Sequence, residues 1–298
     1  MEPQKYLETI LKNQNLDADS QELKDLRKHR EDVEEILHNG FPKATPTIRY
    51  GGSKAKDTMN RESYDLDIVF YLPHDDKSAG ETLKDIFENV TKVLAVHYYV
   101  EPKTSAVRLK DKQNKIDFHI DVVPGRYVDD SKSDCFIYQN GAEKDRLKTN
   151  LDVHVDHVKY SGIVPAIRLL KLWKTRRGLR VKQFVFELLI IKLLRDKKSS
   201  TLDTQLKYVW TALKDAKEPI GVEDPANPTG NDLSEFLKSV WPELSGRSGD
   251  SLNLLEQSGW EAIFGPVNED TDNGGRTEDL KRAAATIIIP TKQWLPKA

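Results

Sequence analysis

The stretch YGGSKAKDTMNRESYDLDIVFYLP, residues 50–73, joins a glycine turn to an apolar strand that carries two carboxylates. Side chains alternate along a strand, so Asp65 and Asp67 share one face while the apolar residues between and after them share the other. Two like charges at this spacing are unfavourable unless a cation lies between them. Carboxylate oxygens on a rigid strand are ligands that Mg²⁺ prefers. The stretch therefore predicts a half-buried strand that binds a divalent metal.

A third carboxylate lies in a second apolar segment, KIDFHIDVVPG, where Asp121 sits between isoleucine and valine. Three aspartates on adjacent strands can hold two metal ions, one beside an attacking hydroxyl and one on a triphosphate. Gly51 and Gly52 would allow close backbone approach, and backbone amides with the Ser53 hydroxyl could bind the β- and γ-phosphates. Each motif alone is typical of a solvated surface. Their order and spacing together favour a phosphoryl- or nucleotidyl-transfer site.

Composition excludes several classes of protein. The 298 residues contain 46 Lys+Arg against 48 Asp+Glu, and the net charge of -2 gives no overall attraction to nucleic acid or membrane. The single cysteine, Cys135, excludes an intrachain disulfide and a multi-cysteine zinc site, and favours a reducing compartment, the cytoplasm. The most apolar run, FVFELLIIKLL, is too short to span a bilayer and is interrupted by Glu187 and Lys192. We therefore expect no membrane segment and no secretory signal.

The pattern along the chain changes near residue 155. Before it, a long helix is predicted from Asp19 to Gly40, with Asp19 and Glu22 as a capping box and Gly40 in the left-handed C-terminal position. Strands and one amphipathic helix follow, which indicates an α+β half with a mainly antiparallel or mixed sheet. After it, helical periodicity dominates, with helices expected at 164–177, 182–196, 201–216, 232–244 and 251–265. We therefore predict two lobes, 1–155 and 156–267, and a linker with tail at 268–298.

These motifs resemble the polymerase-β-like nucleotidyltransferases, and within them the oligoadenylate synthases and the bacterial cGAS/DncV-like enzymes (CD-NTases). The family signature is a glycine-serine pair, a D-x-D and a later aspartate followed by hydrophobic residues and proline. The chain supplies it as Gly52-Ser53, Asp65-Leu66-Asp67 and Asp121-Val122-Val123-Pro124. The resemblance covers about residues 18 to 266. It implies an α+β fold, with a nucleotidyltransferase lobe built on a mixed sheet, a C-terminal helical lobe and an active site in the cleft between them.

Further matches lie in the helical half. AIRLLKLWK looks like the family helix whose lysine reaches the donor triphosphate, which implies that role for Lys171. KQFVFELL resembles the segment that lines the donor base pocket, which implies that role for Gln183 and Phe184. EDPANPTGN, at 223–231, is similar to the family's acidic-proline loop. The chain departs from the family where Lys56 is followed by Asp57 and Thr58 rather than by glycine and threonine, and where Phe184 replaces a tyrosine.

The resemblance also implies an activity and its cofactor. Two Mg²⁺ ions, or Mn²⁺ in their place, would be bound by Asp65 and Asp67, with Asp121 completing one site. Nucleoside triphosphates, ATP among them, would be joined into a cyclic di- or trinucleotide second messenger for antiphage signalling. A linear oligoadenylate synthase, another nucleotide-adding enzyme and an inactive nucleotide-binding regulatory protein remain as alternatives. A regulatory partner protein of an antiphage operon would fit the C-terminal tail by analogy.

Several of these residues also have an interpretation that involves no function. From periodicity alone, Lys171 would extend out of an apolar helix face, and Gln183 and Phe184 would be ordinary first-turn residues. The H-x-x-H of His154 and His157 has metal-ligand spacing, but a structural or exposed role is expected because no carboxylate partner is evident nearby. The basic run at 171–180 could complement a helix C-terminus, line the nucleotide cleft or bind an RNA activator.

Overall fold

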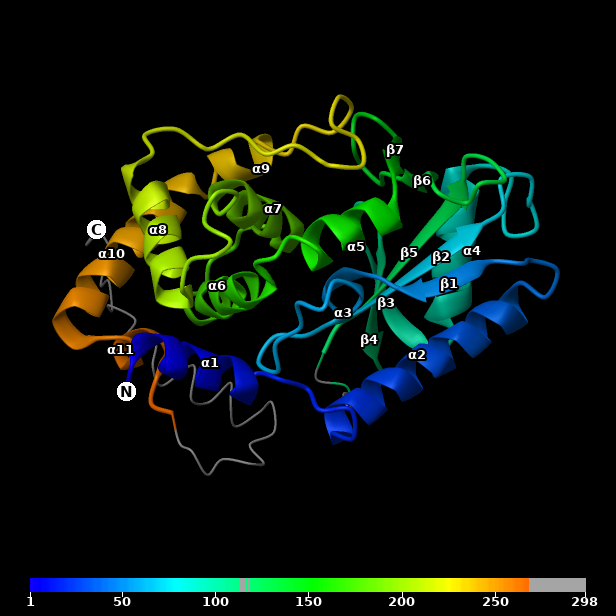
Figure 1. The fold of residues 1–298 in the computed structure, drawn as a ribbon. Helices are drawn as coiled ribbons and strands as arrows, with labels where there is room; N and C mark the ends of the chain where they lie inside the picture. Colours follow the sequence, from blue (N-terminus) through cyan, green and yellow to red (C-terminus); the bar gives the residue numbers. More distant parts are fainter. Residues whose placement is uncertain (113–115, 117, 268–298) are drawn as a thin grey trace, which may run out of the picture.

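The computed structural model describes residues 1–112, 116 and 118–267, so the linker and tail expected at 268–298 lie outside the described residues. Strands gather in one half of the chain and helices in the other (Figure 1). In chain order the elements are α1 (Pro3–Asn13), α2 (Gln21–Gly40), β1 (Thr47–Tyr50), α3 (Gly52–Ala55), β2 (Leu66–Leu72), α4 (Leu83–Ala95), β3 (Tyr98–Pro102), β4 (Val107–Asp111), β5 (Ile120–Tyr127), β6 (Cys135–Tyr138), β7 (Arg146–Thr149), α5 (Leu151–Lys159), α6 (Val164–Arg176), α7 (Gln183–Leu193), α8 (Leu202–Asp215), α9 (Glu235–Lys238), α10 (Trp241–Ser258) and α11 (Glu261–Phe264).

Within the described residues, seven strands form one sheet. The sheet is mixed, as the sequence predicted. Its main order is β1-β2-β5-β4-β3, and β6 joins β5 and is followed by β7. Strands β2 and β5 are parallel, and the other pairs are antiparallel. The sequence did not predict β6 and β7, which are short and lie between polar loops. The parallel pair of β2 and β5 positions the candidate site, because it brings two segments that are distant in the sequence side by side.

One face of this sheet is packed against helices α2 and α4. Leu66, Ile68 and Phe70 of β2 are fully buried in that core, together with alternate residues of β4 and β5. Burying such a side chain contributes about 1.5–3 kcal/mol, so this face fixes the register of the strands. Asp67 is therefore directed to the opposite face of the sheet.

The long helix begins and ends differently from the prediction. Its N-cap is Ser20, whose hydroxyl accepts a hydrogen bond from the amide of Leu23 at 3.3 Å, so the predicted capping role of Asp19 is wrong. Gly40 is the last helical residue and does not have a positive φ, so the predicted left-handed position is also wrong. A Cβ on Gly40 would lie 2.5 Å from Cγ1 of Val93. Glycine is needed there because α2 and α4 approach closely.

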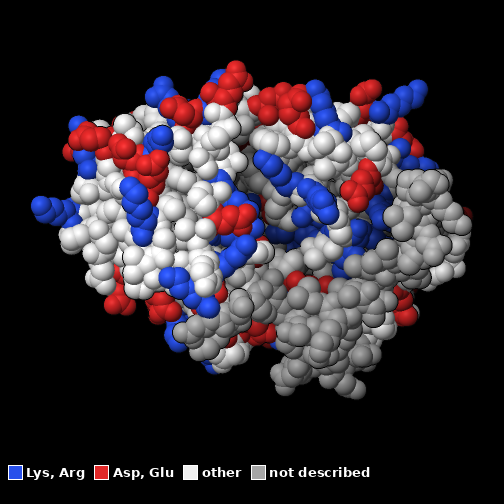
Figure 2. All heavy atoms as spheres, turned by 180° about the vertical axis from the view of Figure 1, so that it is seen from behind, with Lys and Arg blue, Asp and Glu red and all other residues white. Residues whose placement is uncertain are grey.

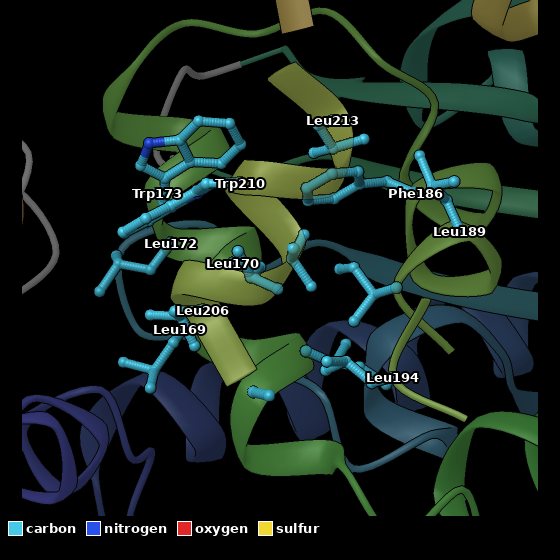
Figure 3. Close-up of a cluster of buried hydrophobic side chains, with 14 of the residues drawn as sticks. Leu169, Leu170, Leu172, Trp173, Phe186, Leu189, Leu194, Leu206, Trp210 and Leu213 are labelled. Carbon is cyan, nitrogen blue, oxygen red and sulfur yellow. The ribbon is translucent and has the colours of Figure 1, made fainter. Parts of the chain in front are cut away.

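The helical half has its own core, formed by α6, α7 and α8 with contributions from α10 and α11 (Figure 3). Trp173 and Trp210 are fully buried at its centre with ring centroids 5.7 Å apart. The indole of Trp173 donates a hydrogen bond to the Ser251 hydroxyl at 2.8 Å, which satisfies its only polar atom. Residues of α1 also belong to this core, so the first helix packs with the second half of the chain. The boundary near residue 155 stays a prediction.

The last two predicted helices are arranged differently. Residues 241–258 form one continuous helix, α10, across the position where two helices were expected. Pro242 occupies the first turn of α10, where its missing amide costs no hydrogen bond. Among the described residues, no helix combines the length and the apolar character needed to cross a membrane.

Candidate active site

Charged side chains form one row across the sheet, on the face opposite α2 and α4. Asp67 of β2 is in register with Asp121 of β5, and Asp121 is in register with Arg108 of β4. The row continues to Glu101 of β3, which is opposite Arg108. The two predicted carboxylates that lie 54 positions apart in the sequence are thus direct neighbours. The spatial relation on which the predicted site depended is present.

Gly52 closes the other end of the row. The Gly51 amide donates to the Asp67 carbonyl at 2.9 Å, which continues the β1–β2 pairing. Gly52 has φ +50°, and a Cβ there would lie 1.5 Å from Oδ2 of Asp67. A side chain at this position is therefore excluded by both conformation and space. Ser53 follows in α3, and its hydroxyl has no hydrogen-bond partner in the part of the chain that the structure describes. The backbone of the glycine turn thus lies directly beside the Asp67 carboxylate, and Ser53 is the next residue along the chain.

Asp67 carries an uncompensated negative charge. Within the described residues its carboxylate accepts no hydrogen bond and has no ion-pair partner. Burial, together with the nearby charges of Asp121 and Asp65, raises the pKa of Asp67 from 3.8 to about 6, while Lys56 and Lys171 act in the opposite direction. A carboxylate held in this way fits a divalent cation, which would relieve the repulsion.

The other two aspartates are engaged with protein groups. Asp65 immediately precedes β2 and accepts a hydrogen bond from the His119 amide at 3.2 Å, and its Oδ1 lies 3.4 Å from Nδ1 of the same histidine. Asp121 accepts two hydrogen bonds from Arg108, one from Nε at 2.8 Å and one from Nη2 at 2.7 Å. Over the described ranges, no three His, Cys, Asp or Glu side chains form a ready-made metal-ligand group. Binding two ions here would require Asp65 and Asp121 to exchange these partners.

The segment that follows α3 connects the sheet to the helical half. Lys56, Thr58, Asn60 and Glu62 are all buried, although they are polar. They lie in a turn-containing segment between α3 and β2 and face α6 and α7. Asn60 donates to the Arg168 carbonyl at 2.8 Å, and the Arg176 Nε donates to Glu62 at 2.9 Å. This segment, 56–62, therefore fixes the glycine turn relative to the helices.

Lys171 lies at the centre of this junction. Its ammonium group donates to the carbonyl of Thr58 at 2.7 Å and to the Thr58 hydroxyl at 2.8 Å, and lies 3.1 Å from Glu187. Glu187 also accepts from Lys56 at 2.5 Å. Burial lowers the pKa of Lys171 to about 8 despite Glu187. Burial alone would raise the pKa of Glu187, but Lys171 and Lys56 lower it. Lys171 is thus buried and paired instead of extending to solvent, and its role at the triphosphate stays a prediction.

We expect Glu187→Ala to destabilise the protein strongly. The change would leave two buried ammonium groups, Lys56 and Lys171, without their shared counter-ion, which costs about 3–5 kcal/mol in comparable buried pairs. Chemical denaturation would measure the loss, with the exposed Glu256→Ala as the control. A triple variant, Lys56→Met, Lys171→Met and Glu187→Leu, should recover most of the stability. A loss below about 1 kcal/mol for Glu187→Ala would contradict the charge assignment.

Gln183 and Phe184 begin α7 close to this junction. Gln183 accepts a hydrogen bond from Lys174 at 3.2 Å, while its Nε2 is buried and has no partner within the described residues. Burial lowers the pKa of Lys174, while Glu187 and Asp65 act in the opposite direction. The Phe184 ring lies 4.5 Å from the His154 ring, and the Lys56 ammonium is 5.0 Å from its centroid. A buried amide donor without an acceptor is consistent with the predicted role in base binding.

His154 does have a carboxylate partner, which the sequence did not reveal. Its Nε2 lies 2.6 Å from Oδ1 of the buried Asp224, which comes from the loop at 223–231. Asn231 donates to the second Asp224 oxygen at 2.7 Å, and Asn227 donates to the Lys148 carbonyl at 3.2 Å. The loop, which belongs to the helical half, is thereby fixed to residues of the first half. The expected structural role of His154 agrees with this arrangement.

Figure 2 shows a hollow near the centre of one face into which Lys and Arg side chains project. The net charge of the chain is close to zero, so this local concentration of positive charge is the feature that would attract an anionic ligand. Four residues near the carboxylates were not singled out as site residues from the sequence: Arg108, Glu187, Lys56 and Lys174. Lys174 belongs to the basic run at 171–180, for which lining the nucleotide cleft was one expectation, and nothing in the sequence marked the other three as site residues.

Comparison with known proteins identifies the fold. No family profile matches the chain, and no curated protein matches it by sequence. Among solved structures, CdnC of E. coli MS115-1, in complex with HORMA-deltaN, superposes with a TM-score of 0.65 at 18% identity over 90% of this chain and 98% of that one. Bradyrhizobium diazoefficiens CdnG, a CD-NTase in complex with GTP, gives 0.66 at 14% identity over 94% and 97%. Vibrio cholerae DncV, a cyclic AMP-GMP synthase, gives 0.57 at 17% over 88% and 82%. The chain therefore has the fold of the bacterial CD-NTases, as the sequence resemblance predicted.

Proposed function

We propose that this protein is a metal-dependent nucleotidyltransferase that joins nucleoside triphosphates, ATP among them, into a cyclic di- or trinucleotide and releases pyrophosphate. The observation that carries the proposal is the register of Asp67 with Asp121 beside the Gly52-Ser53 turn. A structural surface would gain nothing from placing two carboxylates side by side, since their repulsion costs stability. In a site for cations and phosphates, a bound cation would offset the repulsion between the carboxylates.

The carboxylate row fits Mg²⁺, or Mn²⁺ in its place, because hard oxygen donors lie on a rigid sheet and the Asp67 carboxylate has no partner among the described residues. Asp65 and Asp67 would hold both ions, and Asp121 would complete the site nearer the attacking hydroxyl. Bound there, the ions would supply charge stabilisation of the phosphoryl group and lower the pKa of the attacking hydroxyl.

The chain's own residues would orient the donor nucleotide. The Gly52-Ser53 turn offers backbone amides and a free hydroxyl to the β- and γ-phosphates. Lys171 would reach the triphosphate only by leaving Glu187 or Thr58. Lys174 is hydrogen-bonded to Gln183, whose amide nitrogen has no partner within the described residues and would be available to the nucleotide. Phe184 would offer its ring to the base, as Tyr does in the resembling family.

Three structural neighbours support a cyclic product. DncV is a cyclic AMP-GMP synthase, CdnE of Elizabethkingia meningoseptica is a cyclic dinucleotide synthase, and CdnE of Rhodothermus marinus is a c-UMP-AMP synthase. The antiphage role, the cytoplasmic location and a regulatory partner protein belong to the same proposal, and one neighbour, CdnC, is a HORMA complex. A linear oligoadenylate product and an RNA activator are the alternatives that the same site allows.

Labelled ATP, GTP, CTP and UTP incubated with the protein and Mg²⁺ or Mn²⁺ would test the proposal. We expect a product that survives phosphatase, because a cyclic nucleotide has no terminal phosphate. A product that loses its label to phosphatase would indicate a linear oligonucleotide. Absence of any product with all four nucleotides, with either ion and with added RNA, would favour an inactive nucleotide-binding protein.

A further inference from the structure

Arg108 is the one cation in the carboxylate row, and no role follows for it from the fold alone. It lies on β4, directly across from Asp121, and its side chain and the Asp121 side chain are 26% and 15% exposed. The neighbouring β4 residues, Val107 and Leu109, are buried in the core with α2 and α4. Arg108 is therefore on the open face of the sheet, together with the aspartates.

The ion pair between Arg108 and Asp121 uses both carboxylate oxygens. Nε and Nη2 donate to different oxygens of Asp121, so the pair is bidentate and holds the carboxylate in one orientation. Asp65 and Glu101 also raise the pKa of Arg108, after the hydrogen bond to Asp121 itself, so the guanidinium stays charged among the carboxylates. An Asp121 oxygen that accepts from Arg108 cannot at the same time present that lone pair to a cation.

The position of Arg108 relative to the glycine turn indicates what it would bind after release. Gly52 and Ser53 lie beside Asp67 at one end of the row, and Arg108 lies beyond Asp121 at the other. If the donor triphosphate is bound at the glycine turn, the side of Asp121 is where the second nucleotide approaches. The Nη1 of Arg108 has no hydrogen-bond partner in the described part of the chain, and a guanidinium binds phosphate oxygens well.

We propose that Arg108 binds a phosphate of the acceptor nucleotide and competes with the metal for Asp121. Without a metal, Arg108 pairs with Asp121. When a cation binds the Asp121 carboxylate, the guanidinium is released and binds the phosphate. The inference rests on the proposed function. It deepens that function by assigning a residue that recognises the phosphates of the acceptor. Glu101 does not bind the released Arg108 guanidinium in place of the phosphate, because its carboxylate already pairs with Lys103 at 2.5 Å and with Lys110 at 3.3 Å.

Two measurements on the full chain test the competition. Removing the guanidinium in Arg108→Met should increase the affinity for Mn²⁺, measured by calorimetry without nucleotide, by about 5- to 10-fold, because a competing positive charge is lost. Arg49→Met is the matched control, since Arg49 makes a similar two-oxygen ion pair with Asp152 outside the row. Its Mn²⁺ affinity should equal that of the wild type.

The second measurement concerns the acceptor. With labelled ATP as donor, transfer to ATP and transfer to adenosine are compared, since adenosine has the same base and ribose without phosphates. We expect the wild type and Arg49→Met to prefer the phosphorylated acceptor by at least about 10-fold, and Arg108→Met to lose this preference. Arg108→Lys keeps a charge and should recover part of it, which a purely structural role would not explain. Thermal unfolding of each variant reports whether the fold is retained.

The outcomes separate the inference from the function on which it rests. Unchanged Mn²⁺ affinity together with an unchanged preference for ATP in Arg108→Met would overturn the inference while the nucleotidyltransferase stands. A wild-type protein that binds no Mn²⁺ and forms no product would overturn the proposed function itself. If Arg108→Met does not fold, Arg108→Gln takes its place in both measurements, and unchanged Mn²⁺ affinity with an unchanged preference for ATP in that variant would overturn the inference.

Discussion

Asp65→Asn combined with Asp67→Asn should abolish product formation while the protein stays folded. The two carboxylates would hold both metal ions, and metal stabilisation of a transferring phosphoryl group is worth several kcal/mol. Because each 1.36 kcal/mol corresponds to a factor of ten in rate, we expect a loss of at least about a thousandfold. The initial rate of phosphatase-resistant product from labelled nucleotides would measure it.

The same change should make the fold more stable in the absence of divalent ions. The pKa of Asp67 is raised from 3.8 to about 6, so the folded protein binds a proton here more tightly than the unfolded chain does. The stability that this group contributes is therefore present below pH 4 and is lost as the pH rises through about 6. Asparagine cannot ionise, so at pH 7 the variant should be more stable than the wild type by up to about 3 kcal/mol. Below pH 4 the two should converge.

Asp75→Asn is the control for both effects, because Asp75 follows the same strand with a side chain that is 77% exposed. It should change neither the rate nor the stability appreciably. Undiminished synthesis by the double variant would refute the catalytic assignment. Inactivity accompanied by a loss of stability would show that the carboxylates serve the fold instead.

Much of the fold could be predicted because its determinants are local in the sequence. The alternation of Asp65 and Asp67 with buried neighbours fixed the face of β2, and the apolar run around Asp121 identified β5. Asp67 and Asp121 were expected on adjacent strands, but the parallel pairing and the register that places them opposite each other come from the structure. The positions of the long helix and of α6, α7 and α8 followed from their apolar periodicity.

The remaining features depend on pairs of residues that are distant in the sequence. Nothing local to Arg108 distinguishes it from other surface arginines, since its role depends on β4 lying beside β5. Glu187 was expected only as a charge that interrupts an apolar run, yet it is the buried counter-ion of two lysines. Asp224 pairs with His154 across 70 positions. A single sequence contains no signal for such partners, because each pairing is created by the tertiary fold.

Gly52→Ala should reduce the proposed nucleotidyl transfer almost as completely as loss of the carboxylates. An added Cβ would lie 1.5 Å from Oδ2 and 2.4 Å from Cγ of Asp67, so either the turn or the carboxylate must move. A displacement of about 1 Å in an active site can cost about a hundredfold in rate, and here the displaced group is a proposed metal ligand. We expect at least that loss in initial rate. A positive φ at a non-glycine residue also costs about 1–2 kcal/mol of stability.

Gly178→Ala separates these two effects. Gly178 has φ +66°, comparable with the +50° of Gly52, but nothing lies within 4 Å of the position that its Cβ would occupy. Both variants therefore carry the same kind of backbone strain, and only Gly52→Ala pushes against Asp67. We expect similar decreases in the free energy of unfolding from the strain itself, but near-normal synthesis by Gly178→Ala. If Gly52→Ala were as active as Gly178→Ala, the close contact with Asp67 would have no part in catalysis, and the metal site would have to be placed elsewhere.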